Sequence, residues 1–176
     1  MNLFFRLLKT LLLYLLRPRR IDVLGESVVS FRVWPNDLDT NLHMNNGRYM
    51  TLLDLGRLDL LLRVGLARKT FRREWNPVLS AVQLRFRKPL NLFQKFRIRT
   101  RIVTWDEKFV YLEQRIMKGD RLVTHAYLKG VFLGPRGTVP MAEVVALIGP
   151  VPEPPPLPPA FAEWLRAEGA MARALR

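Results

Sequence analysis

The chain of 176 residues has no cysteine and only two histidines, His43 and His125. The absence of cysteine excludes disulfides, thiolate metal sites and cysteine nucleophiles, and it leaves the redox compartment open. Two histidines without cysteine also argue against a zinc site. We therefore expect a protein that works without a metal or another cofactor.

Several motifs and a long apolar run are missing as well. There is no G-x-S-x-G elbow, which disfavours a serine α/β-hydrolase, and no Walker A or G-x-G-x-x-G loop for a nucleotide. The N-terminal apolar segment is shorter than the roughly twenty residues that a membrane-spanning helix needs. A short, tilted span stays an alternative for that segment.

Acidic residues are scarce: 15 Asp and Glu stand against 29 Lys and Arg, which gives a net charge of +14. Such a charge favours an anionic partner, such as a nucleic acid, an anionic membrane or a phosphorylated ligand. No RNP-like aromatic motif, zinc finger or helix-turn-helix is present, so charge alone supports nucleic-acid binding. The length and the 49% apolar content predict one packed domain.

Residues 1–20 predict a basic amphipathic helix, which Pro18 ends near Arg17. Leucine and phenylalanine cover most of its surface, and such a helix is suited to lie in a membrane interface, where Arg19 and Arg20 would attract anionic lipid. The alternative is a helix docked on its own domain. A cleaved signal peptide is disfavoured because no small-x-small site follows. The polar residues fall along one side of the helix: Asn2, Arg6, Lys9, Thr10 and Arg17.

The middle of the chain predicts a strand at Glu26–Trp34 and a long, mostly apolar helix over Tyr49–Val64. A helix this apolar is buried on most sides, so Asp54 needs a partner, for which Arg57 at i+3 is the candidate. A basic link, Ala67–Trp75, follows the helix. Alternation and turn signals beyond it predict four antiparallel strands, roughly Val78–Lys88, Phe96–Trp105, Phe109–Lys118 and Leu122–Leu133.

The order of these elements predicts an α+β fold in which one antiparallel sheet wraps around the buried helix. We divide the chain into the N-terminal helix at 1–20, a globular domain at 21–149 and a tail at 150–176. The tail begins with a proline-rich stretch that we expect to be extended, and it ends in a short helix over Phe161–Leu175.

The densest polar stretch, DLDTNLHMNNGRYM, lies between the predicted strand and the predicted central helix. If the helix starts near Asn45 or Asn46, its free N–H groups and its positive dipole end can hold an oxyanion. Asp39 and His43 lie just upstream, so either can act as base on a water, or Asp39 can attack directly. This combination suits acyl transfer to water. The alternative is structural: a cap at the helix start and an Asx-turn formed by Asp39 and Asn41.

A family resemblance rests on the pattern Asp39-x-Asn41-x-His43-x-Asn45-Asn46-x-x-Tyr49, followed by a long helix and four strands. The pattern resembles the D-x-N-x-H-x-N-N-x-x-Y motif of acyl-ACP thioesterases and the D-x-x-G-H-x-N-N-x-x-Y motif of the 4-hydroxybenzoyl-CoA thioesterase branch. Both belong to the hotdog-fold thioesterases. The chain resembles the THEM-six-like group more closely, through its N-terminal apolar segment, the run PNDLDTNLHMNNGRYM and the PPLPP tail followed by Trp164.

The resemblance implies a hotdog fold and a homodimer, or a dimer of dimers, whose sites lie at the subunit interface. It implies that Asp39 is the base or nucleophile, that Asn41 and His43 assist it, and that the helix start polarises the thioester carbonyl. Leu42 departs from the pattern, because many hotdog thioesterases have Gly there, and it would narrow the site or alter the loop. Tyr49 would also pack the motif onto the sheet. We assign substrate binding to Asn45, Asn46, Arg48 and Tyr49.

The sequence thus predicts an enzyme that hydrolyses acyl-CoA or acyl-ACP. Its basic surface would meet the phosphates of the carrier. We expect it in the cytoplasm, peripheral on an anionic membrane through residues 1–20, and we do not expect nucleic acid as a partner. The alternative, which Leu42 favours, is a hotdog protein that binds acyl groups or membranes without turnover.

Overall fold

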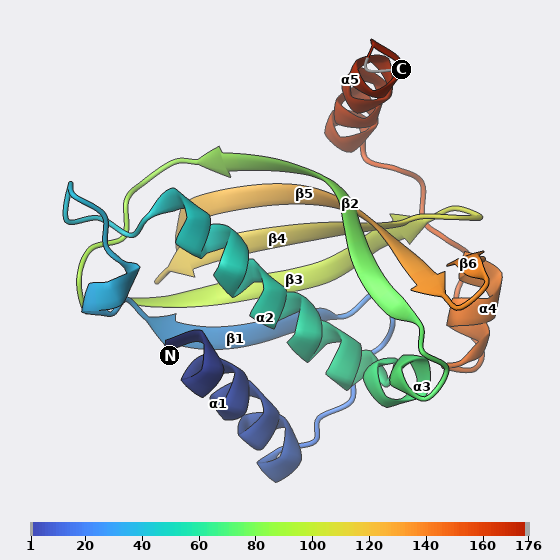
Figure 1. Ribbon diagram of the computed structural model, residues 1–176, viewed down its shortest axis with the longest axis horizontal. Helices are drawn as coiled ribbons and strands as arrows, with labels where there is room; N and C mark the ends of the chain where they lie inside the picture. The colour runs from blue at the N-terminus through green and yellow to red at the C-terminus, as the bar shows by residue number, and fades with distance from the viewer. Residues whose placement is uncertain (1, 175–176) are drawn as a thin grey trace.

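The computed structural model describes residues 2–174. Figure 1 shows the long helix α2 crossing one face of a curved sheet, with α1 beside it. The sheet has six antiparallel strands in the order β1-β3-β4-β5-β2, and β6 pairs with β5. In chain order the elements are α1 (Asn2–Leu16), β1 (Glu26–Arg32), the 3-10 turn η1 (Pro35–Asp37), α2 (Asn46–Val64), α3 (Ala67–Phe71), β2 (Asn76–Phe86), β3 (Lys95–Trp105), β4 (Val110–Lys118), β5 (Arg121–Gly134), β6 (Gly137–Val139), α4 (Met141–Ala146) and α5 (Pro159–Ala174).

The predicted architecture is confirmed: an antiparallel sheet wraps a long helix, which is the arrangement of a hotdog fold. The helix starts at Asn46, within the predicted limits. The sequence analysis did not predict three short elements, namely α3 inside the basic link, β6 and α4. Elements of 5, 3 and 6 residues are too short to carry a periodic pattern. The predicted helix of the tail begins earlier, at Pro159, and its predicted end, Leu175, lies outside the described residues.

Helix α2 buries one side against the inner face of the sheet. There it meets fully buried side chains from three strands, among them Ile98, Ile116 and Leu128. Apolar contact over this length is the main stabilising term of the fold. The buried residues of α2 are Tyr49, Leu52, Leu53, Leu55, Gly56, Asp59, Leu60 and Val64.

Gly56 marks the closest approach of α2 to the sheet. A Cβ atom at this position would lie 2.7 Å from Oγ1 of Thr100 and 2.9 Å from Nε2 of Gln114. The buried Gln114 amide donates to the carbonyl oxygen of Leu53 and to Oγ1 of Thr100, both at 2.9 Å. Glycine is therefore required here because a polar bridge fills the space between helix and sheet.

The buried carboxylate of α2 is Asp59, and this corrects the sequence analysis, which placed Asp54 in the buried position. Asp54 does pair with Arg57, as predicted, but its side chain is 63% exposed. Asp59 is 1% exposed and accepts hydrogen bonds from Ser27 (2.5 Å) and Arg63 (2.6 Å). Periodicity in a nearly all-apolar helix gave too little information to tell the two carboxylates apart.

Helix α1 docks on the domain through a side that is both polar and apolar, since Leu3 and Leu7 pack against the core beside the buried Arg6. Thr10 is buried and donates to the carbonyl oxygen of Arg6, while Arg6 and Lys9 donate to the backbone oxygens of Arg32 (2.7 Å) and Ser30 (3.1 Å) on β1. Other apolar side chains of α1 face outward. No helix within residues 2–174 is long and apolar enough to cross a membrane. The outward residues, each more than half exposed, are Phe4, Phe5, Leu8, Leu12, Leu15 and Leu16.

The two edges of the sheet differ. Helix α1 covers part of the β1 edge through the contacts of Arg6 and Lys9. At the other edge, β2 pairs only with β5 within the described residues. Three apolar side chains of β2 are 38–43% exposed: Val78, Val82 and Phe86. A long, apolar and unpaired edge is a surface on which another strand can pair.

The tail packs on the outer face of the sheet, opposite α2. The hydroxyl of Thr104 donates to the carbonyl oxygen of Pro155 at 2.6 Å. Phe161 of α5 is fully buried, and its ring lies 5.7 Å from the ring of Tyr111 and 4.3 Å from that of Tyr127. The proline-rich segment therefore carries α5 to an aromatic patch on β4 and β5.

Candidate active site

The polar loop between η1 and α2 folds back on itself. Backbone bridges join Leu38 to Met44 and His43 to Asn91, and the N–H of Asp39 donates to the carbonyl oxygen of His43 at 2.9 Å. The N–H of Met44 also donates to the carbonyl oxygen of Leu90. These contacts hold the loop against the turn between β2 and β3. The predicted catalytic residues therefore lie on one short, hydrogen-bonded loop.

Asp39 is half-buried at the base of this loop. Its Oδ1 accepts from the N–H of Asn41 at 2.9 Å and of His43 at 3.4 Å. This is the Asx-turn that the sequence offered as the structural alternative. Within the described residues no hydrogen bond reaches Oδ2, so one carboxylate oxygen holds the loop while the other is open to a water or a substrate.

The backbone N–H of His43 lies near the carboxylate of Asp39, and the side chain of His43 is partly exposed. The side chain of Asn41 is exposed. The second histidine is engaged elsewhere: Nε2 of His125 lies 2.7 Å from Oε1 of Glu113. The hydrogen bond from His125, with help from Arg101, lowers the pKa of Glu113 to about 2. His125 thus pairs with Glu113 on β4 and not with the Asp39 loop.

Leu42 adopts the backbone conformation that glycine favours. Its φ is +59°, in the left-handed region, and its side chain is 72% exposed. The loop therefore keeps the turn that a glycine would make, although the residue is a leucine. The Leu42 side chain points to solvent and does not fill the loop. The chain therefore accommodates leucine in place of glycine at a cost in backbone strain.

Replacing Leu42 with Gly is expected to raise the free energy of unfolding by about 0.5–1 kcal/mol, because the relief of left-handed strain exceeds the entropy that glycine adds to the unfolded chain. Urea unfolding followed by circular dichroism measures the change. The matched control is Leu92→Gly, because Leu92 has no positive φ. This control variant should be less stable than the parent. A Leu42→Gly variant that is less stable than the parent would show that the leucine side chain contributes packing here.

The start of α2 is capped by the motif itself. The side chain of Asn45 accepts from the N–H of Gly47 at 2.8 Å, and Asn45 and Asn46 are both exposed. The capping role that the sequence allowed is confirmed. A cap of this kind stabilises a helix by about 1 kcal/mol. The first turn, with its positive dipole end, lies directly after the Asp39 loop.

Tyr49 is buried, and the half-buried Arg48 pairs with a carboxylate of the chain. Tyr49 is 2% exposed and stacks edge-on against Phe86 at 5.1 Å, so it packs the motif onto the sheet as predicted. Burial raises the pKa of its phenol, contact with the Leu90 backbone opposes this, and the charge of Asp39 adds to the rise. The phenol therefore lies within electrostatic reach of Asp39.

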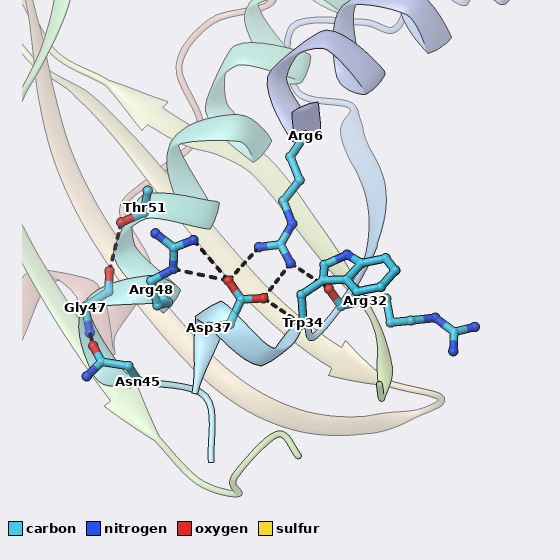
Figure 2. A network of polar contacts seen from close by, with 8 residues as sticks. All are labelled: Arg6, Arg32, Trp34, Asp37, Asn45, Gly47, Arg48 and Thr51. Carbon is cyan, nitrogen blue, oxygen red and sulfur yellow. Dashed lines mark hydrogen bonds and ion pairs between the residues drawn. The ribbon is translucent and has the colours of Figure 1, made fainter. Parts of the chain in front are cut away.

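Sequence reasoning missed Asp37 as the centre of a polar network, which Figure 2 shows. Its carboxylate is fully buried and binds Arg6 of α1 and Arg48 of α2. Arg48, predicted to bind substrate, thus has a partner within the chain. A buried carboxylate needs such partners, but a sequence does not reveal that an arginine 31 positions away supplies one.

The chain also forms an apolar cavity of about 370 Å³ between the C-terminal half of α2, the start of β2 and α4. Arg57 and Asp54 lie at its polar part. Burial lowers the pKa of Arg57 to about 10, and its Nη1 donates to Oε1 of Gln114 at 2.9 Å. Asp39, His43 and Asn45 do not line this cavity, because they lie at the opposite end of α2. Apolar lining residues include Leu58, Leu61, Val78, Leu79, Val131 and Val144.

The fold and the loop at the start of its central helix define a hotdog protein. A model of the thioesterase-like superfamily matches residues 33–165, so the chain belongs to this family. The matched range includes the Asp39 loop, all strands beyond it and the start of α5.

Curated relatives support the resemblance to the THEM-six-like group. Protein THEM6 of Danio rerio is 42% identical over 108 residues, which cover 61% of this chain and 54% of that protein. The probable thioesterase YBR096W of Saccharomyces cerevisiae is 29% identical over 119 residues, covering 65% and 51%. The chain spans about half the length of these relatives.

Solved structures of similar shape agree with the fold. The gentisyl-coenzyme A thioesterase BH1999 gives a TM-score of 0.63 at 21% identity, covering 68% of this chain and 99% of that one. The 1,4-dihydroxy-2-naphthoyl-CoA thioesterase of Synechocystis gives 0.61 at 12% identity, covering 70% and 95%. At these identities the likeness concerns the fold.

Proposed function

We propose that this protein hydrolyses acyl thioesters to a free acid and a thiol. The observation that carries the proposal is the Asp39 carboxylate, which uses Oδ1 to hold its loop and leaves Oδ2 open beside the start of α2. Membership of the thioesterase-like family and the thioesterase names of several relatives support the same activity.

In the proposed reaction Asp39 acts as base on a water or as the attacking nucleophile. A water attacks the thioester carbon and gives its proton to Asp39, and the thiolate then leaves and takes up a proton. The alternative is a mixed anhydride on Asp39 that water hydrolyses. The backbone N–H of Asn46, at the start of α2, would stabilise the oxyanion, and Asn41 and His43 would position water and substrate.

We propose that the apolar cavity receives the acyl group. Its volume of about 370 Å³ falls in the range of small-ligand pockets, and apolar side chains dominate its lining. The carrier is CoA or an acyl carrier protein, since the net charge of +14 attracts the phosphates of either one. Because the lining is mostly apolar, an apolar acyl chain fits this cavity better than a charged one.

We further propose that two copies pair through their β2 edges, with Val78, Val82 and Phe86 at the contact. Antiparallel pairing about a two-fold axis makes the two α2 helices antiparallel. The start of α2 in one protomer then approaches the C-terminal half of α2 in its partner. Such a dimer, alone or as half of a dimer of dimers, would join the Asp39 loop of one copy to the cavity of the other.

The proposal is tested by thiol release from acyl-CoAs of short, medium, long and aromatic acyl groups, followed by acyl-ACP. Turnover that depends on the acyl chain supports the assignment and defines the substrate class. Tight acyl-CoA binding without thiol release would favour the second candidate, a hotdog protein that binds acyl groups without turnover.

We also propose an anionic membrane as a partner of α1, which would make the protein peripheral on the cytoplasmic side. The outward side of α1 is a row of exposed leucines and phenylalanines, and three exposed arginines follow the helix: Arg17, Arg19 and Arg20. An apolar face next to basic residues matches the chemistry of an anionic lipid interface. Because these exposed side chains face away from the domain, α1 can meet lipid without leaving the domain.

Replacing Leu8, Leu12 and Leu15 together with Gln is expected to lower binding to anionic vesicles by about 100-fold or more, because each buried leucine contributes about 1.5–3 kcal/mol. Vesicle flotation measures the change. Met171→Gln on α5 is the control, since Met171 is 68% exposed on the other terminal helix. Unchanged flotation of the triple variant would reject the proposal. Deletion of residues 1–20 is a poorer test, because it also removes Arg6 from its buried contact with Asp37.

A further inference from the structure

The carboxylate of Asp37 joins three segments of the chain (Figure 2). Oδ2 accepts from Nη2 of Arg6 at 2.5 Å and from the N–H of Trp34 at 2.8 Å. Oδ1 accepts from Nη1 of Arg6 and from Nε and Nη2 of Arg48, each at 3.1 Å. Asp37 is 0% exposed, so this one side chain ties α1, η1 and α2 together inside the protein.

Arg6 reaches Asp37 from α1, an element outside the sheet that wraps α2. Its side chain is 5% exposed, and it binds both carboxylate oxygens and the carbonyl oxygen of Arg32. A guanidinium that binds a carboxylate with two nitrogens fixes the orientation of that carboxylate as well as its charge. Because both groups are buried, neither has water as a substitute partner when the other is removed.

The backbone of Asp37 extends this contact to the candidate active site. Its carbonyl oxygen accepts from the N–H of Asn45 at 2.8 Å, and Asn45 caps α2. Asp39 follows two positions later on the same loop, and Arg48 lies in the first turn of α2. A displacement of Asp37 would therefore move the carboxylate that we propose as catalytic and the helix start that we propose as the oxyanion site.

We propose that Arg6 is a positioning residue, which makes the Asp39 loop and the start of α2 depend on the docking of the N-terminal helix. The inference rests on the proposed thioesterase function for its kinetic consequence, but its structural consequence stands independently. The helix that we propose as the membrane contact then also supports the active site, and its role is more than that of an anchor.

The test compares Arg6→Met with Lys9→Met in the full chain. Lys9 is the matched control, because it also docks α1 on β1, through the carbonyl oxygen of Ser30, but has no contact with Asp37. Hydrogen–deuterium exchange of the segment 38–48 is measured first, at a temperature where both variants are folded. We expect exchange about 10-fold faster or more in Arg6→Met, and exchange within about twofold of the parent in Lys9→Met.

Kinetics with an acyl-CoA substrate gives the second measurement. We expect kcat of Arg6→Met to fall by about 10- to 100-fold with KM within about threefold, because a small misplacement of a reacting group slows the chemical step more than it weakens binding. Arg6→Lys, which keeps the charge and one contact, should recover part of the loss. A variant that lost activity only through instability would recover kcat on cooling. Its kcat would then match that of Lys9→Met.

The outcomes distinguish this inference from the proposed function. If the parent protein shows no thioester turnover, the proposed function fails and exchange alone decides the role of Arg6. If Arg6→Met and Lys9→Met match in exchange and in kcat, the positioning role is rejected. If Arg6→Met does not fold, the same comparison is made with Arg6→Lys, for which we expect a smaller change in the same direction.

Discussion

Asp39→Asn is expected to lower thioester turnover by about 10²- to 10⁴-fold, the range that loss of a general base produces. The amide of Asn retains an oxygen that can accept from the N–H groups of Asn41 and His43, so the Asx-turn persists. It has no basic carboxylate oxygen for a water and no nucleophile for a thioester. Thiol release from the best acyl-CoA, measured for parent and variant at equal concentration, gives the ratio.

Asp120→Asn is the matched control for this experiment. Asp120 is a fully exposed carboxylate that lies 3.6 Å from Arg97, and the same isosteric change there should leave turnover within about twofold, as surface substitutions usually do. Unfolding curves and sedimentation of both variants should match the parent. Full activity of Asp39→Asn would reject Asp39 as the catalytic group, and the open Oδ2 would then have no chemical role.

Val82→Glu is expected to dissociate the proposed dimer and to lower turnover with it. Val82 lies near the middle of β2 and is 38% exposed. In the proposed pairing about a two-fold axis, the variant places two carboxylates near each other in an apolar contact. Juxtaposed like charges cost several kcal/mol, which corresponds to a rise in the dissociation constant of about 100-fold or more. Sedimentation velocity over a range of protein concentrations measures this change.

Val28→Glu is the control for Val82→Glu, because Val28 lies on β1 at the opposite edge of the sheet and is 44% exposed. It should leave the association state as in the parent. Val82→Glu that remains dimeric would reject the β2 edge as the interface. A monomeric Val82→Glu with full turnover would keep the interface and reject a site shared between protomers.

The sequence by itself determined the wrapped sheet and the position of the candidate loop. The apolar run of α2 and the alternation in β3 and β4 follow from local periodicity, which depends on residues close together in the chain. The motif around Asp39 and Asn45 also follows from local chemistry, because caps and Asx-turns form between near neighbours. The helix start and both turn interactions are therefore where the sequence placed them.

Only the tertiary structure decided which side of α1 faces the protein. The sequence showed a polar and an apolar side, and burial of apolar surface would favour docking through leucine. The structure docks a mixed side, in which Leu3 and Leu7 pack against the core while Arg6 and Lys9 find acceptors on η1 and β1. These partners are 21 to 31 residues distant, so no local pattern contains them.

The tertiary structure also selected the buried carboxylates and formed the cavity. Asp37 and Asp59 are buried because arginines and a serine from other elements or turns reach them, whereas Asp54 stays exposed. Burial of a charge depends on the sum of its contacts in space, and a sequence records only the order of residues. The sequence thus determined the elements and the chemistry of the loop, while the packing of those elements determined which charges are buried and what holds the loop in place.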